Sequence, residues 1–375
     1  MALACVAEAG DLRLRDALRV AEAPEVWHAV RTSTTDDAWT RRAAQLDLGA
    51  VVAAGHRHGL RFLIPSDPDW PTGLADLDHS EPVQRWGGMP VGLWVRGRAC
   101  LAELTASAVA IVGCRASTAY GDRIASDLGA GLAATGTTVV SGGAFGIDAA
   151  AHRGALAEGG PTIAVMAGGL DDYYPKGNTA MLGQVAEHGL VVSETPPGVA
   201  PSRRRFLTRN RLIAGLSAGV VVVEGTARSG ARNTVSWATS CLRLVMAVPG
   251  PVSNSTSYLP HLLVRDREAE LVTGLEDVRE AIAPMGQDLL TRATQPRLLD
   301  ELDADQAAVY EALPSRGSRS TGEIALESGV HLRVALVALE ELRARGLAAA
   351  LPDGGWRLGV VQDRPVRSAQ QQGRR

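Results

Sequence analysis

The chain has 375 residues, of which 46% are hydrophobic and 21% are charged. This length predicts a main domain with smaller flanking units, and the composition excludes a chain that is disordered throughout. The formal net charge is −3, so a nucleic-acid site would have to be a local concentration of basic residues. Apolar runs such as Val220–Val223 and Leu244–Val248 are too short to cross a bilayer, so we expect no membrane partner.

Cysteine and histidine spacing argues against metal and disulfide sites. The histidines His56 and His58 lack further ligands at zinc spacing, and no serine or cysteine lies in a recognisable nucleophile turn. We therefore expect a cytoplasmic protein without catalytic residues, metal or other cofactor. The four cysteines lie far apart, at Cys5, Cys100, Cys114 and Cys241.

Residues 1–95 are predicted to form a small helical N-terminal region of the SAM-like type. Apolar positions recur at helical spacing in Leu12–Val20, whereas Pro65, Pro68 and Pro71 exclude a helix further on. The segment Gly92–Gly97 is predicted as a short strand that leads into the main domain.

Residues 96–285 alternate between apolar runs and helical patterns. The runs are nearly continuous in apolar residues, as in strands that are buried on both faces. This alternation predicts an α/β fold, a Rossmann-like doubly wound and mostly parallel sheet. The predicted strands are Val109–Val112, Thr137–Val140, Thr162–Met166, Leu190–Ser193, Gly219–Val223 and Leu244–Val248, and helices between them are Gly121–Ala134, Asp148–Glu158 and Asn178–His188.

The last quarter of the chain predicts a second unit. Residues 286–302 are predicted as a linker, and residues 303–360 as a winged-helix domain with helices at Asp305–Leu313, Ser320–Ser328 and His331–Arg345. The sequence Asp353-Gly-Gly within Leu347–Leu358 would form the turn of a two-stranded wing. The polar tail, residues 361–375, is predicted to be disordered.

Glycine-rich turns follow the first two predicted strands of the main domain. Arg115 follows the first strand, whereas Gly142 and Gly143 follow the second, ahead of Asp148 and His152. Such turns let backbone N–H groups approach a phosphate, so we expect an anion site with Asp148 and His152 in supporting roles. Strand-to-helix turns also need glycine for geometry alone, and each turn taken singly is explained by that alternative.

Lys176 is the only lysine of the chain and precedes a predicted helix at the same edge of the sheet. The arginine bias is typical of a GC-rich genome. An ammonium at this place can act as a point charge for a phosphate, although a solvated surface lysine is the ordinary alternative.

An arginine-rich segment, residues 201–216, gives the strongest local signal. Arg203 and Phe206 combine a guanidinium with an aromatic ring, which suits the phosphates and bases of single-stranded DNA. We expect residues 209–211 mainly to brace this segment as a loop, with Glu224 paired to Arg209 or Arg211. A merely solvated charge run would explain Phe206 poorly.

These motifs together resemble the DprA/Smf family of bacterial DNA-processing proteins. The resemblance implies a protein without enzymatic activity that binds incoming single-stranded DNA, protects it and loads the RecA recombinase in natural transformation. By position, Arg115, Lys176, Arg203 and Phe206 match residues that contact DNA in the family, and Arg209 and Asn210 lie in its most characteristic motif. We therefore count Arg209 and Asn210, with Gly142 and Gly143, among the candidate DNA-binding residues. The matching segments include Ile111–Arg115, Ser141–Asp148, Ala151-His152, Gly169–Asp171, Tyr174-Pro175, Ser193-Glu194, Arg209–Arg211 and Ala247–Gly250.

Several positions depart from the family pattern. The family usually has arginine in place of Phe145 and proline in place of Leu207, which predicts a weaker pocket with one charge fewer. The family forms homodimers, for which Val264 and Leu271 are the candidate contacts here.

Two other functions fit parts of the sequence. A related Rossmann-like fold serves nucleotide-binding proteins and phosphoribohydrolases, but the chain lacks the glycine-rich run with a catalytic glutamate of those enzymes. The winged helix could also read duplex DNA. Its predicted recognition helix carries Glu340 and Glu341, which favours contact with a protein instead.

Overall fold

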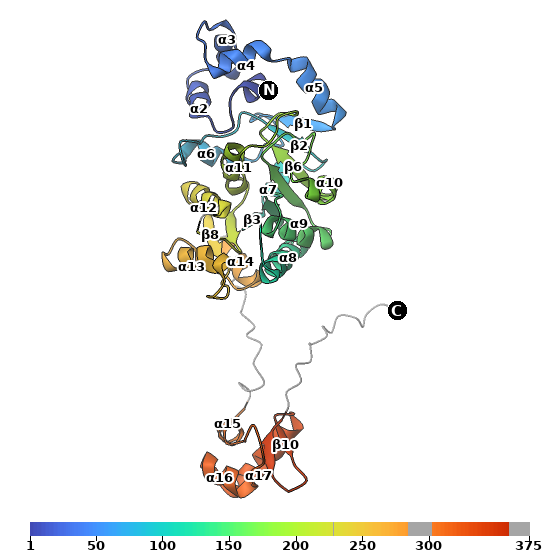
Figure 1. Ribbon diagram of the computed structural model, residues 1–375, viewed down its shortest axis with the longest axis vertical. Coiled ribbons are helices and arrows are strands. Elements are labelled where there is room, and N and C mark those ends of the chain that lie inside the picture. The colour runs from blue at the N-terminus through green and yellow to red at the C-terminus, as the bar shows by residue number, and fades with distance from the viewer. Residues whose placement is uncertain (228, 284–301, 360–375) are drawn as a thin grey trace. The chain divides into compact units, whose positions relative to one another are not determined.

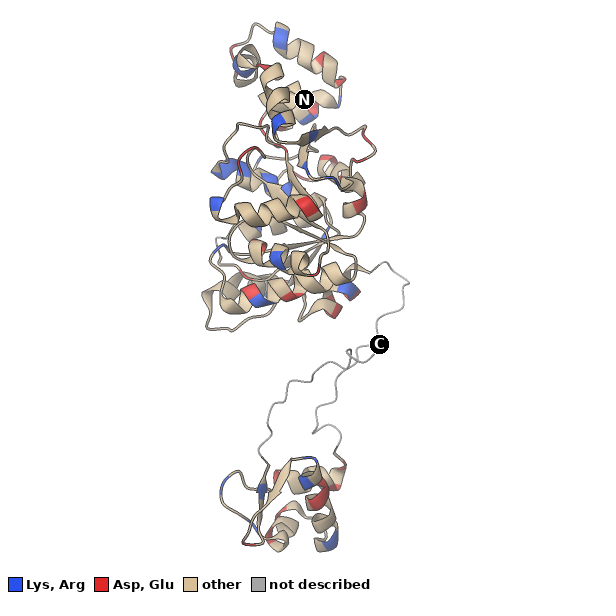
Figure 2. Ribbon diagram, turned by 90° about the vertical axis from the view of Figure 1, so that its right-hand side faces the viewer, with Lys and Arg blue, Asp and Glu red and all other residues tan. Residues whose placement is uncertain are grey.

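The computed structural model describes residues 1–227, 229–283 and 302–359 (Figure 1). The chain divides into two compact units, Met1–Leu290 and Thr291–Arg375. None of the helices in the described ranges is long and apolar enough to cross a membrane. Basic and acidic positions are interspersed over the helices of both units (Figure 2). The predicted tail lies outside the described residues, as does the predicted linker apart from its last residue.

A nine-stranded sheet forms the centre of the first unit. Its order is β1-β2-β6-β5-β4-β3-β7-β8-β9, with parallel pairing from β6 to β9 and antiparallel pairing of β2 with β1 and β6. This arrangement confirms the predicted α/β fold with a mostly parallel sheet. The strands are β1 (Leu60–Leu63), β2 (Leu93–Arg96), β3 (Ala108–Val112), β4 (Thr138–Ser141), β5 (Thr162–Met166), β6 (Leu190–Ser193), β7 (Gly219–Val222), β8 (Leu244–Ala247) and β9 (Glu270–Leu271).

Helices cover both faces of this sheet. Alternate residues of β3 enter two different apolar cores, because successive side chains of a strand point to opposite faces. Helices α8 (Ala119–Ala134), α9 (Ile147–Ala157), α10 (Thr179–His188) and α14 (Leu275–Ile282) pack on one face. On the other face lie α11 (Arg203–Gly215), α12 (Gly230–Ser240) and α13 (Tyr258–Arg265). Short helices complete the unit: η1 (Thr72–Ala75), α6 (Asp76–His79), α7 (Leu101–Thr105), η2 (Lys176–Asn178) and η3 (Ser255–Ser257).

The arginine-rich segment is helical. Our expectation that residues 209–211 brace this segment as a loop is wrong, because α11 runs through it. Ser202 caps the N-terminus of α11 by accepting a hydrogen bond from the Arg205 backbone at 3.3 Å. Behind the cap, Leu212 and Ile213 pack into the core and hold the helix on the sheet.

Five short helices precede the sheet and lie at one end of it (Figure 1). The first four share an apolar core that includes Leu3, Leu14, Val26 and Trp39. The helices are α1 (Ala2–Val6), α2 (Leu12–Leu18), α3 (Ala23–Thr32), α4 (Ala38–Gln45) and α5 (Leu48–Arg57).

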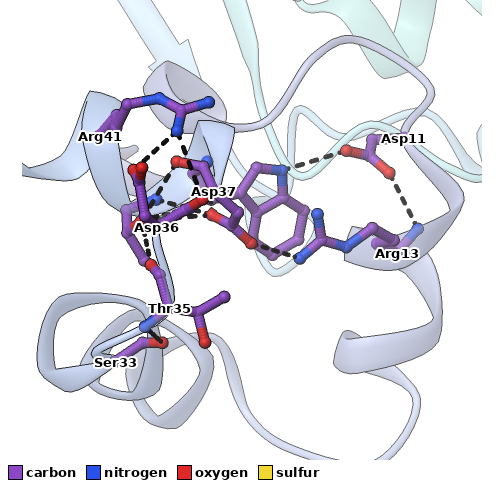
Figure 3. Close-up of polar contacts among 9 residues, drawn as sticks. Asp11, Arg13, Ser33, Thr35, Asp36, Asp37 and Arg41 are labelled. Atoms are coloured by element: carbon purple, nitrogen blue, oxygen red, sulfur yellow. Dashed lines mark hydrogen bonds and ion pairs between the residues drawn. The ribbon is translucent and has the colours of Figure 1, made fainter.

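Polar contacts join these helices at their ends (Figure 3). Asp37 caps α4 and forms an ion pair with Arg13 at 2.9 Å, and the Arg13 guanidinium lies 4.7 Å from the centre of the Trp39 ring. Hydrogen bonds from the Thr40 backbone and from Arg13 lower the pKa of Asp37 to about 2. The Trp39 indole donates to Asp11 at 3.1 Å. We therefore assign this polar cluster a structural role.

The second unit has three helices followed by an antiparallel pair of strands, the order predicted for residues 303–360. Its own apolar core includes Val309, Ile324, Leu339 and Trp356. The elements are α15 (Ala304–Glu311), α16 (Thr321–Ser328), α17 (Leu332–Ala344), β10 (Ala348–Ala350) and β11 (Trp356–Leu358).

Candidate functional site

A cleft of about 950 Å³ lies at the carboxyl ends of β3 and β7. The chain runs from β3 to β4 on one side and returns to β7 on the other, so these two strands flank the topological switch point of the sheet. Ligands of doubly wound folds bind at such points. The walls are the loop 113–116, one side of α11 and the first turns of α12, and we call this space the α11 cleft.

One side of α11 faces the cleft. Arg203, Phe206, Leu207, Asn210 and Ile213 line it, at the spacing of three or four residues that places side chains on one face of a helix. The aromatic ring and the guanidinium that the sequence singled out are therefore brought together at the wall of the cleft.

The other basic residues of α11 point elsewhere. Glu8 of the N-terminal region accepts ion pairs from Arg204 at 2.7 Å and from Arg205 at 3.3 Å. Arg211 is fully buried and pairs with Glu194 at 2.7 Å. Tertiary contacts thus leave Arg203 as the basic residue of the 203–205 run that reaches the cleft.

Phe206 is the centre of an aromatic group. The Arg115 guanidinium lies 4.7 Å from the centre of its ring, and the Tyr174 ring lies 5.8 Å away. Phe145 and Tyr174 are 49% and 45% exposed, although large apolar rings are usually buried. A small hollow joins this group to the cleft, and we call it the aromatic hollow. Its lining is Arg115, Gly142, Ala144, Phe145, Tyr174, Pro175 and Phe206.

Arg209 is a buried residue that packs beneath the aromatic group, next to Phe206. Its guanidinium donates to the backbone carbonyls of Gly142, at 2.8 Å, and of Val165, and lies 5.9 Å from the centre of the Phe206 ring. Burial lowers the pKa of Arg209 to about 10, so it remains charged at neutral pH. A Cβ atom on Gly142 would lie 2.6 Å from this guanidinium, so this position needs glycine because of the close approach. These hydrogen bonds fit the bracing role that we expect of residues 209–211, while the DNA contact that the sequence also suggests for Arg209 stays a prediction.

Asp148 and His152 lie behind the second glycine turn. The Asp148 carboxylate accepts a hydrogen bond from the Ala144 backbone at 3.3 Å, and burial raises the pKa of this carboxyl although Arg209 opposes the shift. His152 is fully buried, its Nδ1 lies 2.8 Å from the Thr162 hydroxyl, and burial lowers its pKa to about 3. The ring is neutral at physiological pH, which fits a structural role.

Glu224 braces the loop after β3 instead of the arginines of α11. Its carboxylate accepts hydrogen bonds from the Thr118 backbone at 2.9 Å, the Thr118 hydroxyl at 2.6 Å and the Thr256 hydroxyl at 2.9 Å. Our predicted pairing with Arg209 or Arg211 is wrong, because those side chains are bound to backbone carbonyls and to Glu194. Burial, with Glu224 nearby, raises the pKa of the Cys114 thiol to about 11, so this cysteine is not a thiolate nucleophile.

The remaining predicted residues lie at the edges of the site. Lys176 forms an ion pair with Asp172, is 70% exposed, and does not line the α11 cleft. The Asn210 amide donates to Asn233 of α12 at 3.1 Å and so joins the two helices that form the wall. Val264 is half-buried on α13, and Leu271 is 51% exposed on the edge strand β9.

Sequence reasoning missed Tyr174 and misjudged Phe145. The chain has three phenylalanines, and two of them lie at the aromatic hollow. Phe145 and Phe206 are far apart in the sequence, so only the fold shows that they lie together. Relative to the arginine that the family resemblance led us to expect at position 145, Phe145 has no charge and adds an exposed ring.

Comparisons with known proteins agree in their assignment. A family model described as DNA recombination-mediator protein A matches residues 61–283. A Mycobacterium tuberculosis protein named as a DNA processing protein, DprA, is 47% identical over 305 residues, which cover 80% of this chain and 78% of the relative. Protein Smf of Escherichia coli K12 is 35% identical over 302 residues, covering 79% and 77% of the two chains.

Two solved structures share the fold. The X-ray structure of DNA processing protein A from Streptococcus pneumoniae superposes with a TM-score of 0.61 at 31% identity, and covers 73% of this chain and 93% of its own. The structure of DNA processing protein A from Helicobacter pylori, reported for its unique single-stranded DNA binding mode, has a TM-score of 0.51 at 25% identity. It covers 59% of this chain and 95% of its own.

Proposed function

Because the chain belongs to the DNA recombination-mediator protein A family, we propose that it binds single-stranded DNA along the α11 cleft and the aromatic hollow. Arg115 and Arg203 would hold phosphates, and Phe206, with Tyr174 beside it, would stack on a base. The relative from Helicobacter pylori, with its reported single-stranded DNA binding mode, supports this choice of ligand.

The observation that carries the proposal is the arrangement of Arg115 over the Phe206 ring, next to the exposed Tyr174 ring. Phe206 is half-buried with guanidinium groups beside its ring, and Tyr174 next to it is exposed. Such a group offers charge to a phosphate and stacking to its base. Bases in a duplex are already stacked and paired, so this arrangement favours a strand whose bases are free.

The charge of the cleft supports the same ligand. Among the residues that the structure describes, Arg115, Arg203, Arg209 and Arg232 line it together with one carboxylate, that of Asp148. Arg232 is paired with Glu268 at 2.7 Å, and Arg209 is bound to backbone carbonyls, which leaves Arg115 and Arg203 as the phosphate contacts that we propose. The Asp148 carboxylate is buried behind the second glycine turn and is held by the Ala144 backbone.

Fluorescence anisotropy with labelled single-stranded and duplex oligonucleotides over a salt series tests the proposal. We expect tighter binding of the single strand, and Arg115→Ala should lower the slope of log K against log salt by about 0.7. Phe206→Ala should weaken binding without that change in slope. The control is Arg153→Ala, an exposed arginine on α9 outside the cleft. Equal affinity for duplex and single strand, or wild-type affinity in both cleft variants, would contradict the proposal.

The wider role that we propose follows the family. The chain would act in the cytoplasm without catalysis, as a homodimer that protects incoming single-stranded DNA and loads RecA onto it. Val264 and Leu271 are the proposed dimer contacts, and we assign residues 303–360 to the winged-helix class. RecA strand exchange on DNA that is coated with single-strand binding protein tests the loading step, which Arg115→Ala should slow if loading requires binding in the cleft.

A further inference from the structure

The outer face of α17 is apolar, although this helix lies at the surface of the second unit. Leu332, Val334, Leu336 and Val337 are between 40% and 57% exposed. The opposite side of the helix provides Ala335, Ala338, Leu339 and Leu342 to the core. Four exposed apolar side chains on one helix of a small unit indicate an interaction site.

The charges on this face are arranged with a symmetry. Arg333, Leu336, Val337 and Glu340 follow one another at intervals of three, one and three residues, which places them along one side of the helix. The two apolar residues stand at the centre, with a basic residue three positions before them and an acidic residue three positions after them.

This order of residues is complementary to the same order on a second helix that runs in the opposite direction. In two identical antiparallel helices, a two-fold axis between Leu336 and Val337 sets each Leu336 against Val337 of the second copy. The same axis sets Arg333 against Glu340 of the second copy, at both ends of the contact. A C₂ interface requires a self-complementary patch of this kind.

Arg333 is unpaired among the described residues, and Glu340 is held in an ion pair that is open to solvent. That pair joins Glu340 to Arg343 at 2.8 Å, and both side chains are half-exposed. A phosphate backbone would instead require several basic residues, and the row contains one arginine, with an acidic residue at its other end.

We propose that the outer face of α17 is a self-association surface that binds the same face of a second copy of the chain. This surface is distinct from the proposed dimer contacts Val264 and Leu271 of the first unit. Two chains could associate through this surface of their second units independently of any ligand bound to their first units. The proposal does not depend on the proposed binding of DNA.

The first test removes the apolar centre in the full-length chain. Leu336→Glu and Val337→Glu should each raise the dissociation constant of one association step by about tenfold or more, measured by sedimentation velocity over a concentration series. Arg316→Glu is the matched control, since Arg316 is exposed on the same unit outside α17. Because Leu336 and Val337 are half-exposed, we expect both variants to keep their circular dichroism spectrum.

The second test uses the symmetry of the charges. Arg333→Glu and Glu340→Arg chains each place like charges together at both ends of a self-pair, so each should associate weakly alone. Mixed in equal amounts, the two variants place opposite charges together at both ends and should associate with each other as the wild type does, measured by energy transfer between labelled chains.

Three results would overturn the proposal. In the first, substitutions at positions 336 and 337 leave the self-association of the chain unchanged. In the second, the mixed charge variants associate no better than either variant alone, and in the third, α17 variants lose duplex DNA binding while their self-association is unchanged. The third result would make the face a DNA-binding surface. Association through the first unit would be equally strong in the wild type and in all α17 variants. It therefore cannot produce the expected loss of association in those variants.

Discussion

Substitution of Phe145 tests the contribution of stacking to DNA binding without changing the charge of the proposed site. It is 49% exposed in the aromatic hollow, and its removal takes away no charge. Stacking of one base on an aromatic side chain contributes about 1–3 kcal/mol. Since a factor of ten in affinity corresponds to about 1.4 kcal/mol, Phe145→Ala should raise the dissociation constant for single-stranded DNA by about 5-fold to 150-fold. The slope of log K against log salt should stay unchanged, because that slope counts phosphate contacts.

The assay is fluorescence anisotropy with one labelled oligonucleotide at several salt concentrations. The Phe145→Arg variant should instead steepen the slope of log K against log salt by about 0.7, because it adds a charge and removes the ring. Val252→Ala is the control, since Val252 is 94% exposed and outside the cleft and the hollow. An affinity of Phe145→Ala within twofold of the wild type, or a loss of salt slope in that variant, would refute the reasoning.

Three further predictions concern charge, pH and packing. Asp172→Asn should release Lys176 from its exposed ion pair and tighten single-strand binding up to about fivefold, since such pairs contribute at most about 1 kcal/mol. His152 has a folded pKa of about 3 against 6.5 unfolded, so stability should be full above pH 6.5 and fall by on the order of 4 kcal/mol as the pH drops to 3. Urea unfolding of His152→Asn should show a smaller fall. Gly142→Ala, whose Cβ would lie 2.6 Å from a buried guanidinium, should lose about 1–3 kcal/mol in the same assay and bind DNA more weakly.

Each of these has a contradicting outcome. Unchanged affinity on removal of the charge of Asp172 would show that Lys176 does not contact the strand. A His152→Asn variant with the wild-type dependence of stability on pH would assign the acid loss to other groups. For the glycine, Gly183→Ala in α10 is the matched control because nothing lies within 4 Å of its Cβ, and equal stability of the two alanine variants would contradict the packing argument.

The strands of the main domain could be predicted from sequence because each is buried on both faces. Continuous runs such as Thr162–Met166 and Leu190–Ser193 leave no alternation to misread, and the six predicted strands end within one residue of those observed. The helix α11 was not predicted, because its many arginines obscure the helical spacing of its apolar residues in the sequence. Leu212 and Ile213, which hold it on the sheet, come only at its end.

The partners of charged residues could not be predicted from sequence. Glu224 was expected to pair with Arg209 or Arg211, yet it binds the hydroxyls of Thr118 and Thr256. Which cation lies beside a carboxylate depends on how strands and helices are placed in space, and the local sequence contains no signal for that. The meeting of the glycine turns at one edge of the sheet was predictable, because the carboxyl ends of parallel strands lie there.

The N-terminal region contributes to the charge of the cleft through α11. Burial opposes ionisation of Glu8, yet Arg205, Arg204 and Arg42 together hold the pKa of its carboxyl below the usual range. The carboxylate therefore stays charged and keeps the guanidinium groups of Arg204 and Arg205 on the far side of the helix. Arg203 alone of that run is left for the cleft, so its phosphate contacts would be directed by a residue almost two hundred positions earlier in the chain. Removing the N-terminal helices would then change which arginines α11 offers to DNA as well as the stability of the first unit.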